Sequence, residues 1–358
     1  MPHLLGRFAA HKRAMPGALF CGTAKSHRCN PAASVKVEKL YGMPVLFSGM
    51  ASLVLTKAEV NMVDQHYYNS LRNLLKVHTG TPHSFVLFMS GSLPGTALLH
   101  LRQLGLYSMI TRLPTDPLNL RARHALTFST PSCKSWFTQV RNICLLYGLP
   151  HPLSLLNNPL SKESFKKIAK SHVMDYWEVK LRQEASLLPS LKNFKPEFHS
   201  LSNSHPILWM AGTNPYEVSK ALIQLKMLSG RYRTAMVTRH WTNNKNGWCP
   251  SPSCSTVQES LEHLLLTCPY YDQTRQKLFR LWRSTKNSIV LHLVSSALEF
   301  PPDLLLQFIL DASTIPAVIS LSQIYGTDLL QAIFHLTRSW CYAIHIVRGK
   351  LLRTLLQQ

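Results

Sequence analysis

The segment "TDLLQAIFHLTRSWCYAIHIVRGKLLRTLL" (residues 327–356) lies at the C-terminal end of the sequence and carries one uninterrupted helical pattern. Its apolar residues recur every three or four positions and so share one face of a helix. This stripe consists of Leu329, Leu330, Ile333, Trp340, Ile344, Val347 and Leu351. Thr327 stands where an N-cap residue is expected. The segment therefore predicts a long C-terminal helix.

The same periodicity recurs upstream. The stretch 90–113, with its Pro-Gly turn, predicts a second and a third helix, and residues 214–230 predict another. Residues 59–77 predict an amphipathic helix whose apolar face consists of Val60, Val63, Tyr67, Leu71, Leu74 and Leu75. Alternating strand patterns are nearly absent, and we therefore predict a mostly α fold.

Stretches rich in helix breakers separate these segments. Residues 149–160 hold three prolines and two asparagines, and residues 188–206 form a second such stretch. Both predict loops or boundaries. Between them a helix is expected to begin after Ser161, a suitable N-cap, with one face formed by Phe165, Ile168, Tyr176 and Val179.

Composition bounds the class of protein. The chain has 358 residues, of which 46% are hydrophobic, so it can bury a sizeable core in two or three domains. The formal net charge of +22 favours nucleic acid as a partner. No apolar run reaches the roughly 18 to 20 residues of a membrane-spanning helix, so no membrane partner is expected. The eight cysteines show no disulfide framework, which indicates a reducing compartment.

The N-terminal residues are basic, and the first acidic residue is Glu38. Residues 1–36 are predicted to form a disordered leader. A mitochondrial transit peptide is the alternative interpretation, but the segment lacks a clean amphipathic stripe. We expect a location in the nucleus or the cytoplasm.

Four metal-ligand residue types gather within a short stretch of the chain. Cys249, Cys254, His263 and Cys268 follow the spacing C-x4-C-x8-H-x4-C. Zinc prefers four such ligands in a tetrahedron, supplied as a close pair on a loop and a second pair on or beside a helix. The spacing therefore predicts a zinc site. The alternative is a set of buried thiols with a histidine on a helix surface.

Local signals support this arrangement. Pro250 and Pro252 suit a turn that brings the first two sulfurs together. Ser255 and Gln258 read as a capping box that opens a short helix carrying His263. On that helix the residues expected to face a small core are Leu261, Leu264 and Leu265.

A basic flank surrounds the cysteine cluster, because no acidic residue occurs from Val218 to Gln258. Basic side chains contact phosphates, and aromatic ones can stack on unpaired bases. The alternative is a solvated basic face, with Trp241 and Trp248 packed in the core. The predicted nucleic-acid-binding residues are Lys226, Arg231, Arg233, Arg239, His240, Lys245, Arg275 and Lys277.

At these residues a family resemblance can be stated. The motifs "LSGRYRT" (228–234), "RHW" (239–241) and "LEHLLLTCP" (261–269), with the cysteine spacing, resemble the C-terminal zinc-binding region of non-LTR (LINE-type) retrotransposon reverse transcriptases. The likeness covers roughly residues 37–350. Within this range, residues 41–56 resemble the end of the polymerase domain and the thumb that follows it, residues 91–113 and 135–153 resemble the connector, and residues 334–345 resemble the tail. The resemblance implies metal-ligand roles for Cys249, Cys254, His263 and Cys268 and a zinc region that grips nucleic acid.

The chain departs from that family in its acidic residues. Polymerase chemistry needs two Mg²⁺ ions held by clustered carboxylates, which reverse transcriptases supply through an adjacent Asp pair and an upstream Asp. Here the seven aspartates lie at least 8 residues apart. We therefore expect a protein that is not an enzyme, truncated so that it lacks the polymerase palm and the endonuclease.

These observations predict five regions: a leader (1–36), a thumb-like helical region (37–150), a helical connector (151–212), a basic zinc-binding module (213–285) and a helical tail (286–358). The leading hypothesis is a non-catalytic, zinc-stabilised nucleic-acid-binding fragment, with RNA as the expected partner and DNA as the alternative partner. The alternatives are a helical adaptor that binds protein and a translated retroelement remnant without a selected function. Added salt should weaken binding to phosphates but not adaptor binding.

Overall fold

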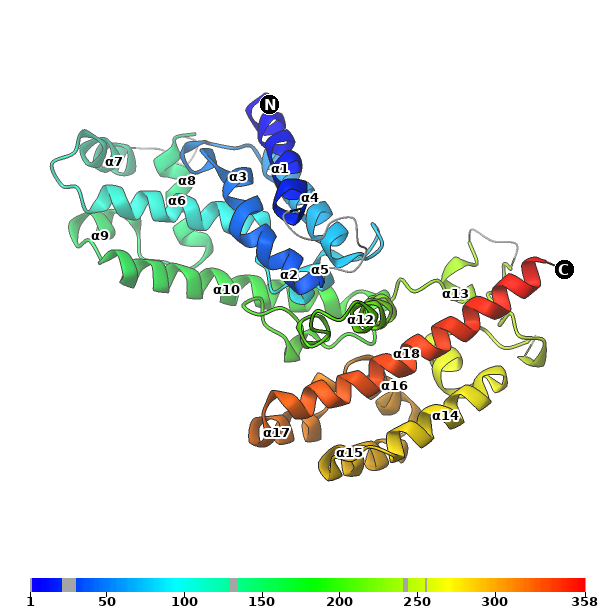
Figure 1. Ribbon diagram of the computed structural model, residues 1–358. Helices are drawn as coiled ribbons and strands as arrows, with labels where there is room; N and C mark the ends of the chain where they lie inside the picture. The colour runs from blue at the N-terminus through cyan, green and yellow to red at the C-terminus, as the bar shows by residue number, and fades with distance from the viewer. Residues whose placement is uncertain (1, 21–29, 129–133, 241–243, 255, 358) are drawn as a thin grey trace.

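The computed structural model describes residues 2–20, 30–128, 134–240, 244–254 and 256–357 and consists of helices joined by short turns (Figure 1). Across these residues the only β-type pairing is an isolated antiparallel bridge between Trp248 and Gln258. The predicted mostly α class is therefore confirmed. The helices form an N-terminal lobe and a C-terminal lobe, and α12 is the part of the C-terminal lobe that faces the N-terminal lobe (Figure 1).

The N-terminal lobe is built around α6, which packs against both α4 and α10. A capping box between Thr56 and Glu59 begins α4. The helices of this lobe are α1 (Pro2–Phe20), α2 (Pro31–Val37), α3 (Met43–Phe47), α4 (Lys57–Leu75), α5 (His83–Ser90), α6 (Gly95–Thr111), α7 (Pro117–Phe128), α8 (Trp136–Leu146), α9 (Pro152–Asn157) and α10 (Lys162–Ser186). The prediction of two helices after the Pro94-Gly95 turn is wrong, because one continuous helix, α6, follows the turn, and α5 precedes it.

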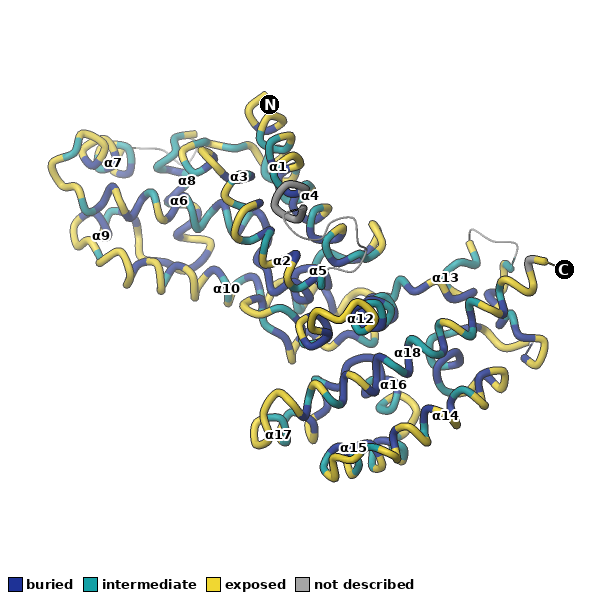
Figure 2. Tube along the Cα trace, in the orientation of Figure 1, coloured by how far each residue is buried: buried dark blue, intermediate teal, exposed yellow. Residues whose placement is uncertain are grey.

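The C-terminal lobe is organised by the long helix α18. Its buried face packs on α12, α14, α16 and α17 (Figure 2), and Trp340 lies fully buried against Trp282. The elements are α11 (Pro206–Trp209), α12 (Pro215–Leu228), α13 (Ala235–Thr238), α14 (Asp272–Arg283), α15 (Ser288–Leu298), α16 (Pro302–Leu310), α17 (Pro316–Tyr325) and α18 (Thr327–Leu356). The predicted C-terminal helix is confirmed. Its cap differs: Thr327 is the first helical residue, after Gly326 with φ at 75°.

Three local predictions are corrected. Residues 2–20 of the expected disordered leader form α1, because Leu4, His11 and Met15 are buried against the N-terminal lobe. The proline-rich stretch 149–160 contains α9, since proline is compatible with the first turn of a helix. The cysteines of the leader, Cys21 and Cys29, lie outside the described residues.

The third correction concerns α10. Ser161 caps it as predicted, its hydroxyl accepting a hydrogen bond from the Ser164 N–H at 3.2 Å. Val179 is 54% exposed, however, so it does not share the buried face with Phe165. That face continues instead through Ala169, Val173, Trp177, Leu181 and Ala185, which follow one another at four-residue steps.

Within the described residues no single helix is both long enough and apolar enough to cross a membrane. The helices α5 and α6 reach that length and composition only when taken as a pair, and they are bent by 59° at the break between them.

Candidate metal centre and basic pocket

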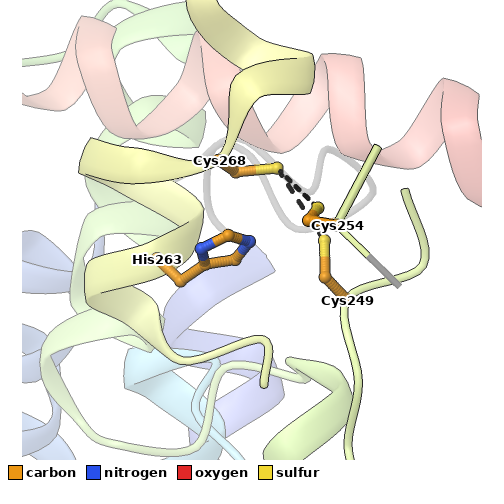
Figure 3. Close-up of side chains that lie close together, drawn as sticks. All are labelled: Cys249, Cys254, His263 and Cys268. Atoms are coloured by element: carbon orange, nitrogen blue, oxygen red, sulfur yellow. Dashed lines mark hydrogen bonds between the residues drawn. The ribbon is translucent and has the colours of Figure 1, made fainter. Parts of the chain in front are cut away.

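Four side chains from residues 249–268 converge on one point (Figure 3). The sulfur of Cys268 lies 3.8 Å from that of Cys249 and 3.6 Å from that of Cys254, and all four ligand atoms, including that of His263, lie within 4.8 Å of one another. A tetrahedral ion with metal–sulfur bonds of about 2.3 Å places its sulfurs about 3.8 Å apart. A disulfide would need about 2.05 Å. The group could therefore hold a metal ion.

The imidazole of His263 is oriented for this role. Its ring points toward the sulfurs (Figure 3), and its Nδ1 lies 3.2 Å from the hydroxyl oxygen of Thr267. Its Nε2 is buried and has no hydrogen-bond partner among the described residues. A buried polar atom without a partner is costly unless a ligand satisfies it. The Thr267 contact leaves Nε2 as the nitrogen that faces the sulfurs, as in metal-binding histidines.

The four residues are buried, and burial sets their protonation. It raises the pKa of the Cys249 and Cys268 thiols, so without a metal these sulfurs keep their protons. It lowers the pKa of His263 and so favours the neutral imidazole. A metal ion would supply the positive charge that stabilises the thiolates in this apolar environment.

Local backbone structure brings the ligands together. Cys249 donates its N–H to the carbonyl of Val257 at 2.7 Å, which closes the loop between the first two cysteines and the helical ligands. The predicted capping box is wrong, because Gln258 pairs with Trp248 in the β-bridge; Ser255 lies outside the described residues. Ser260 acts as the cap instead, accepting from the His263 N–H at 3.0 Å.

His263 begins a π-helical turn, His263–Thr267, and Cys268 follows directly after it in an extended conformation. Such turns are rare and are frequently found at functional sites. As predicted, Leu264 and Leu265 are buried and Leu261 packs against the core. The carbonyl of Leu265 accepts a hydrogen bond from the indole of Trp340 at 3.3 Å. The ligand segment is therefore attached directly to α18.

Glu259 connects the metal centre with the basic residues, a role that sequence reasoning missed. It is fully buried, and its two carboxylate oxygens accept from the Arg348 guanidinium at 2.7 and 2.8 Å. It also accepts from the Ala235 N–H, at the start of α13, at 2.5 Å. The one available signal was its position, as the first acid after the acid-free stretch 218–258.

A basic pocket of about 850 Å³ lies beside these contacts. It is formed by the loop after α4, by α12 with the segment that follows it, and by α18. None of the described residues that line it is acidic. The Nε of Arg231 is buried there without a hydrogen-bond partner in the described part of the chain. The basic residues and histidines of the lining are Lys76, His78, Lys226, Arg231, Arg233, His345 and Arg348.

The predicted nucleic-acid-binding residues divide into three sets. Lys226, Arg231 and Arg233 line the pocket together. Outside its lining, His240, Lys245 and Lys277 are exposed and Arg239 is half-buried. Arg275 is a correction, because it is 5% exposed and donates to the carbonyl of Cys268 and to Asp272. A guanidinium held in this way supports the metal loop and is not free for phosphate.

The two tryptophans of the basic flank do not both lie in the core. Trp248 is 44% exposed, so the alternative that places it in the core is wrong. Its indole is available for stacking near the ligand loop. Trp241 lies outside the described residues.

No family model, curated protein or solved structure matches this chain.

Proposed function

We propose that this protein is a non-catalytic nucleic-acid-binding module in which zinc, held by Cys249, Cys254, His263 and Cys268, stabilises a basic binding surface. Zinc is the metal that three thiolates and one imidazole in a tetrahedron favour. The likeness of the motifs to LINE-type reverse transcriptases supports the same assignment and suggests a retroelement origin.

The observation that carries the proposal is a pocket whose described lining residues include no acidic one. Lys226, Arg231 and Arg233 come from neighbouring segments and line this one space. In the described residues Arg231 Nε is a buried donor that lacks a partner, which a phosphate oxygen would satisfy. Phosphate contacts of this kind position a nucleic acid without reading its sequence. Single-stranded or structured RNA is the preferred partner, because exposed Trp248 offers a face for base stacking.

The metal centre and the pocket are coupled through shared contacts. Glu259 joins α13 to Arg348 of the pocket, only four residues before the ligand His263. The zinc ion thereby fixes the basic residues that flank it. We propose no catalytic role, because polymerase chemistry needs clustered carboxylates and neither metal-ligand group of the described residues contains more than one carboxylate.

The test measures RNA affinity against salt concentration for the wild type and for a Lys226→Ala, Arg231→Ala, Arg233→Ala triple variant. For single strands the slope of log affinity against log salt is about −0.7 per neutralised phosphate, so losing three contacts should flatten it by about 2 units. The control replaces Lys166, Lys167 and Lys170 by Ala; these exposed residues of α10 lie in the other lobe. The control removes the same charge and should leave the slope nearly unchanged.

Zinc content and circular dichroism confirm that both variants are folded. A pocket variant that keeps zinc and binds RNA with the wild-type slope would refute the nucleic-acid proposal. It would favour the helical adaptor, for which binding to a protein partner should be insensitive to these three residues.

A further inference from the structure

A second group of metal-ligand side chains lies between the connecting segment 199–205 and the end of α16. The Nε2 atoms of His199 and His205 each lie 3.1 Å from Oδ2 of Asp311, and 3.2 Å from each other. All three residues are buried, the carboxylate completely. Three donor atoms thus form a nearly equilateral triangle inside the protein.

This triangle has the dimensions of a metal site. With bonds of about 2.1 Å, ligands at right angles lie about 3.0 Å apart and ligands at the tetrahedral angle about 3.4 Å apart. The observed distances of 3.1 to 3.2 Å lie between these values. Two imidazoles and one carboxylate on one side of an ion form a common donor set for divalent transition metals, which leaves further coordination positions open.

Neighbouring groups hold the donors in this geometry. Oδ1 of Asp311 accepts from both the N–H and the hydroxyl of Ser313, at 3.2 and 2.5 Å, which directs Oδ2 toward the histidines. The His199 ring stacks on Phe194 with 12° between the planes. Such outer contacts are a regular part of metal centres because they fix the ligand orientation.

Space for a further ligand exists beside the donors. A pocket of about 500 Å³ is lined by His199, His205 and Ser313, together with Ser200 and Ser204. The pocket therefore lies next to the two histidines, although the side chains of His205 and Asp311 are themselves fully buried. We propose that His199, His205 and Asp311 form a second metal site, which takes a divalent transition-metal ion of the zinc class with at least one coordination position open to this pocket.

One contact has to change when the metal binds. Nδ1 of His205 accepts from the Ile207 N–H at 3.2 Å, so a neutral His205 carries its proton on Nε2 when no metal is present. A metal on Nε2 moves this proton to Nδ1 and replaces that bond. The hydrogen bond that is lost caps only the four-residue helix α11. The metal ion gains three bonds, to His199, His205 and Asp311, which outweigh this loss. A purely hydrogen-bonded cluster is thus the alternative that the experiment must separate.

The experiment titrates the metal-free full chain with Co²⁺ and follows its absorption. Thiolate ligands give a sulfur-to-cobalt charge-transfer band, which imidazole and carboxylate ligands do not. We expect the wild type to bind two equivalents. His199→Gln and Asp311→Asn should each bind one equivalent of Co²⁺ and keep the sulfur-to-cobalt charge-transfer band. Cys249→Ala should also bind one equivalent but should lack that band at its wild-type intensity. Circular dichroism verifies that each variant is folded.

A second measurement needs no variant. X-ray absorption of the zinc-loaded wild type should show about half the sulfur ligands per zinc that the cysteine centre alone provides. Saturation at one equivalent with the full sulfur count would overturn the proposal, as would two equivalents retained by His199→Gln and Asp311→Asn. Because RNA is absent from both measurements, their failure leaves the proposed nucleic-acid binding standing.

Discussion

Two glycines at positive φ show how a single position can fix the course of the backbone, here at the turn that precedes Arg231. Gly230 ends the turn after α12 with φ at +65°, and a Cβ there would meet the backbone carbonyl oxygen of Ser190 at 1.8 Å. Only glycine combines this left-handed conformation with so close a backbone approach. Gly148 has a similar φ of +62° but open space around it. A comparison of the two positions therefore separates the free-energy cost of a side chain at positive φ from the additional cost of a clash with the Ser190 backbone.

We predict that Gly148→Ala lowers the free energy of unfolding by about 1 kcal/mol, because only backbone strain is added. Gly230→Ala should cost more, about 3 kcal/mol or above, since the segment around Ser190 must also move. Urea unfolding followed by circular dichroism measures both. If the two variants lose the same free energy of unfolding, the segment 188–191 can move without cost and does not hold the turn at Gly230 in place.

At the scale of elements, the ligand segment is a small unit that a bound metal ion would hold together. The described residues within 249–268 form a bridge and short helical turns, so little regular hydrogen bonding holds them without an ion. Structural zinc contributes directly to folding free energy. The helices of the N-terminal lobe pack on one another, with α6 in contact with α4 and α10.

We predict that Cys249→Ala removes the zinc bound by this segment and abolishes amide-exchange protection between residues 247 and 268. Protection in α4, α6 and α10 should persist. Cys144→Ala is the matched control, because this buried thiol lies in α8 and outside the ligand group. Metal analysis and hydrogen exchange provide the measurements. Loss of zinc from Cys144→Ala, or unchanged protection in Cys249→Ala, would contradict the assignment.

At the scale of the whole molecule, partly buried histidines make stability depend on pH. Burial lowers the pKa of His66, His83 and His100 to about 4, from about 6.5 in the unfolded chain. Between these values the unfolded chain binds protons that the folded chain does not. The free energy of unfolding is therefore highest above about pH 6.5 and falls as the pH is lowered toward 4.

We predict that His100→Gln weakens this pH dependence, because the most deeply buried of the three imidazoles no longer titrates. Its contribution between pH 6.5 and 4 is at most about 3 kcal/mol. The control is His124→Gln, an exposed residue of α7, which should leave the pH profile unchanged. Thermal unfolding at a series of pH values tests this. A profile unaltered in His100→Gln would exclude this histidine as a source of the acid sensitivity.

Sequence patterns were informative where one helix or one short loop contains all the interacting residues. The apolar stripe around Trp340 and the Ser161 cap follow from spacing alone, because neighbours three to five residues apart meet within a turn. The same holds within each of the two pairs of metal ligands, whereas the two pairs come together through the loop contact between Cys249 and Val257. The capping-box prediction failed because Gln258 takes a partner, Trp248, from across the loop. Arg275 was misassigned because nothing in its neighbourhood predicts that its side chain turns inward to Cys268.

The sequence by itself thus determined the helical class and the local ligand set. Only the tertiary structure decided how distant residues meet: Glu259 with Arg348 across 89 positions, His205 with Asp311 across 106, and the basic pocket from Lys76 to Arg348. Local spacing fixes which side chains share a helix face. Which faces come together depends on the packing of whole helices, and the burial of groups such as Asp311 and Glu259 is a result of that packing.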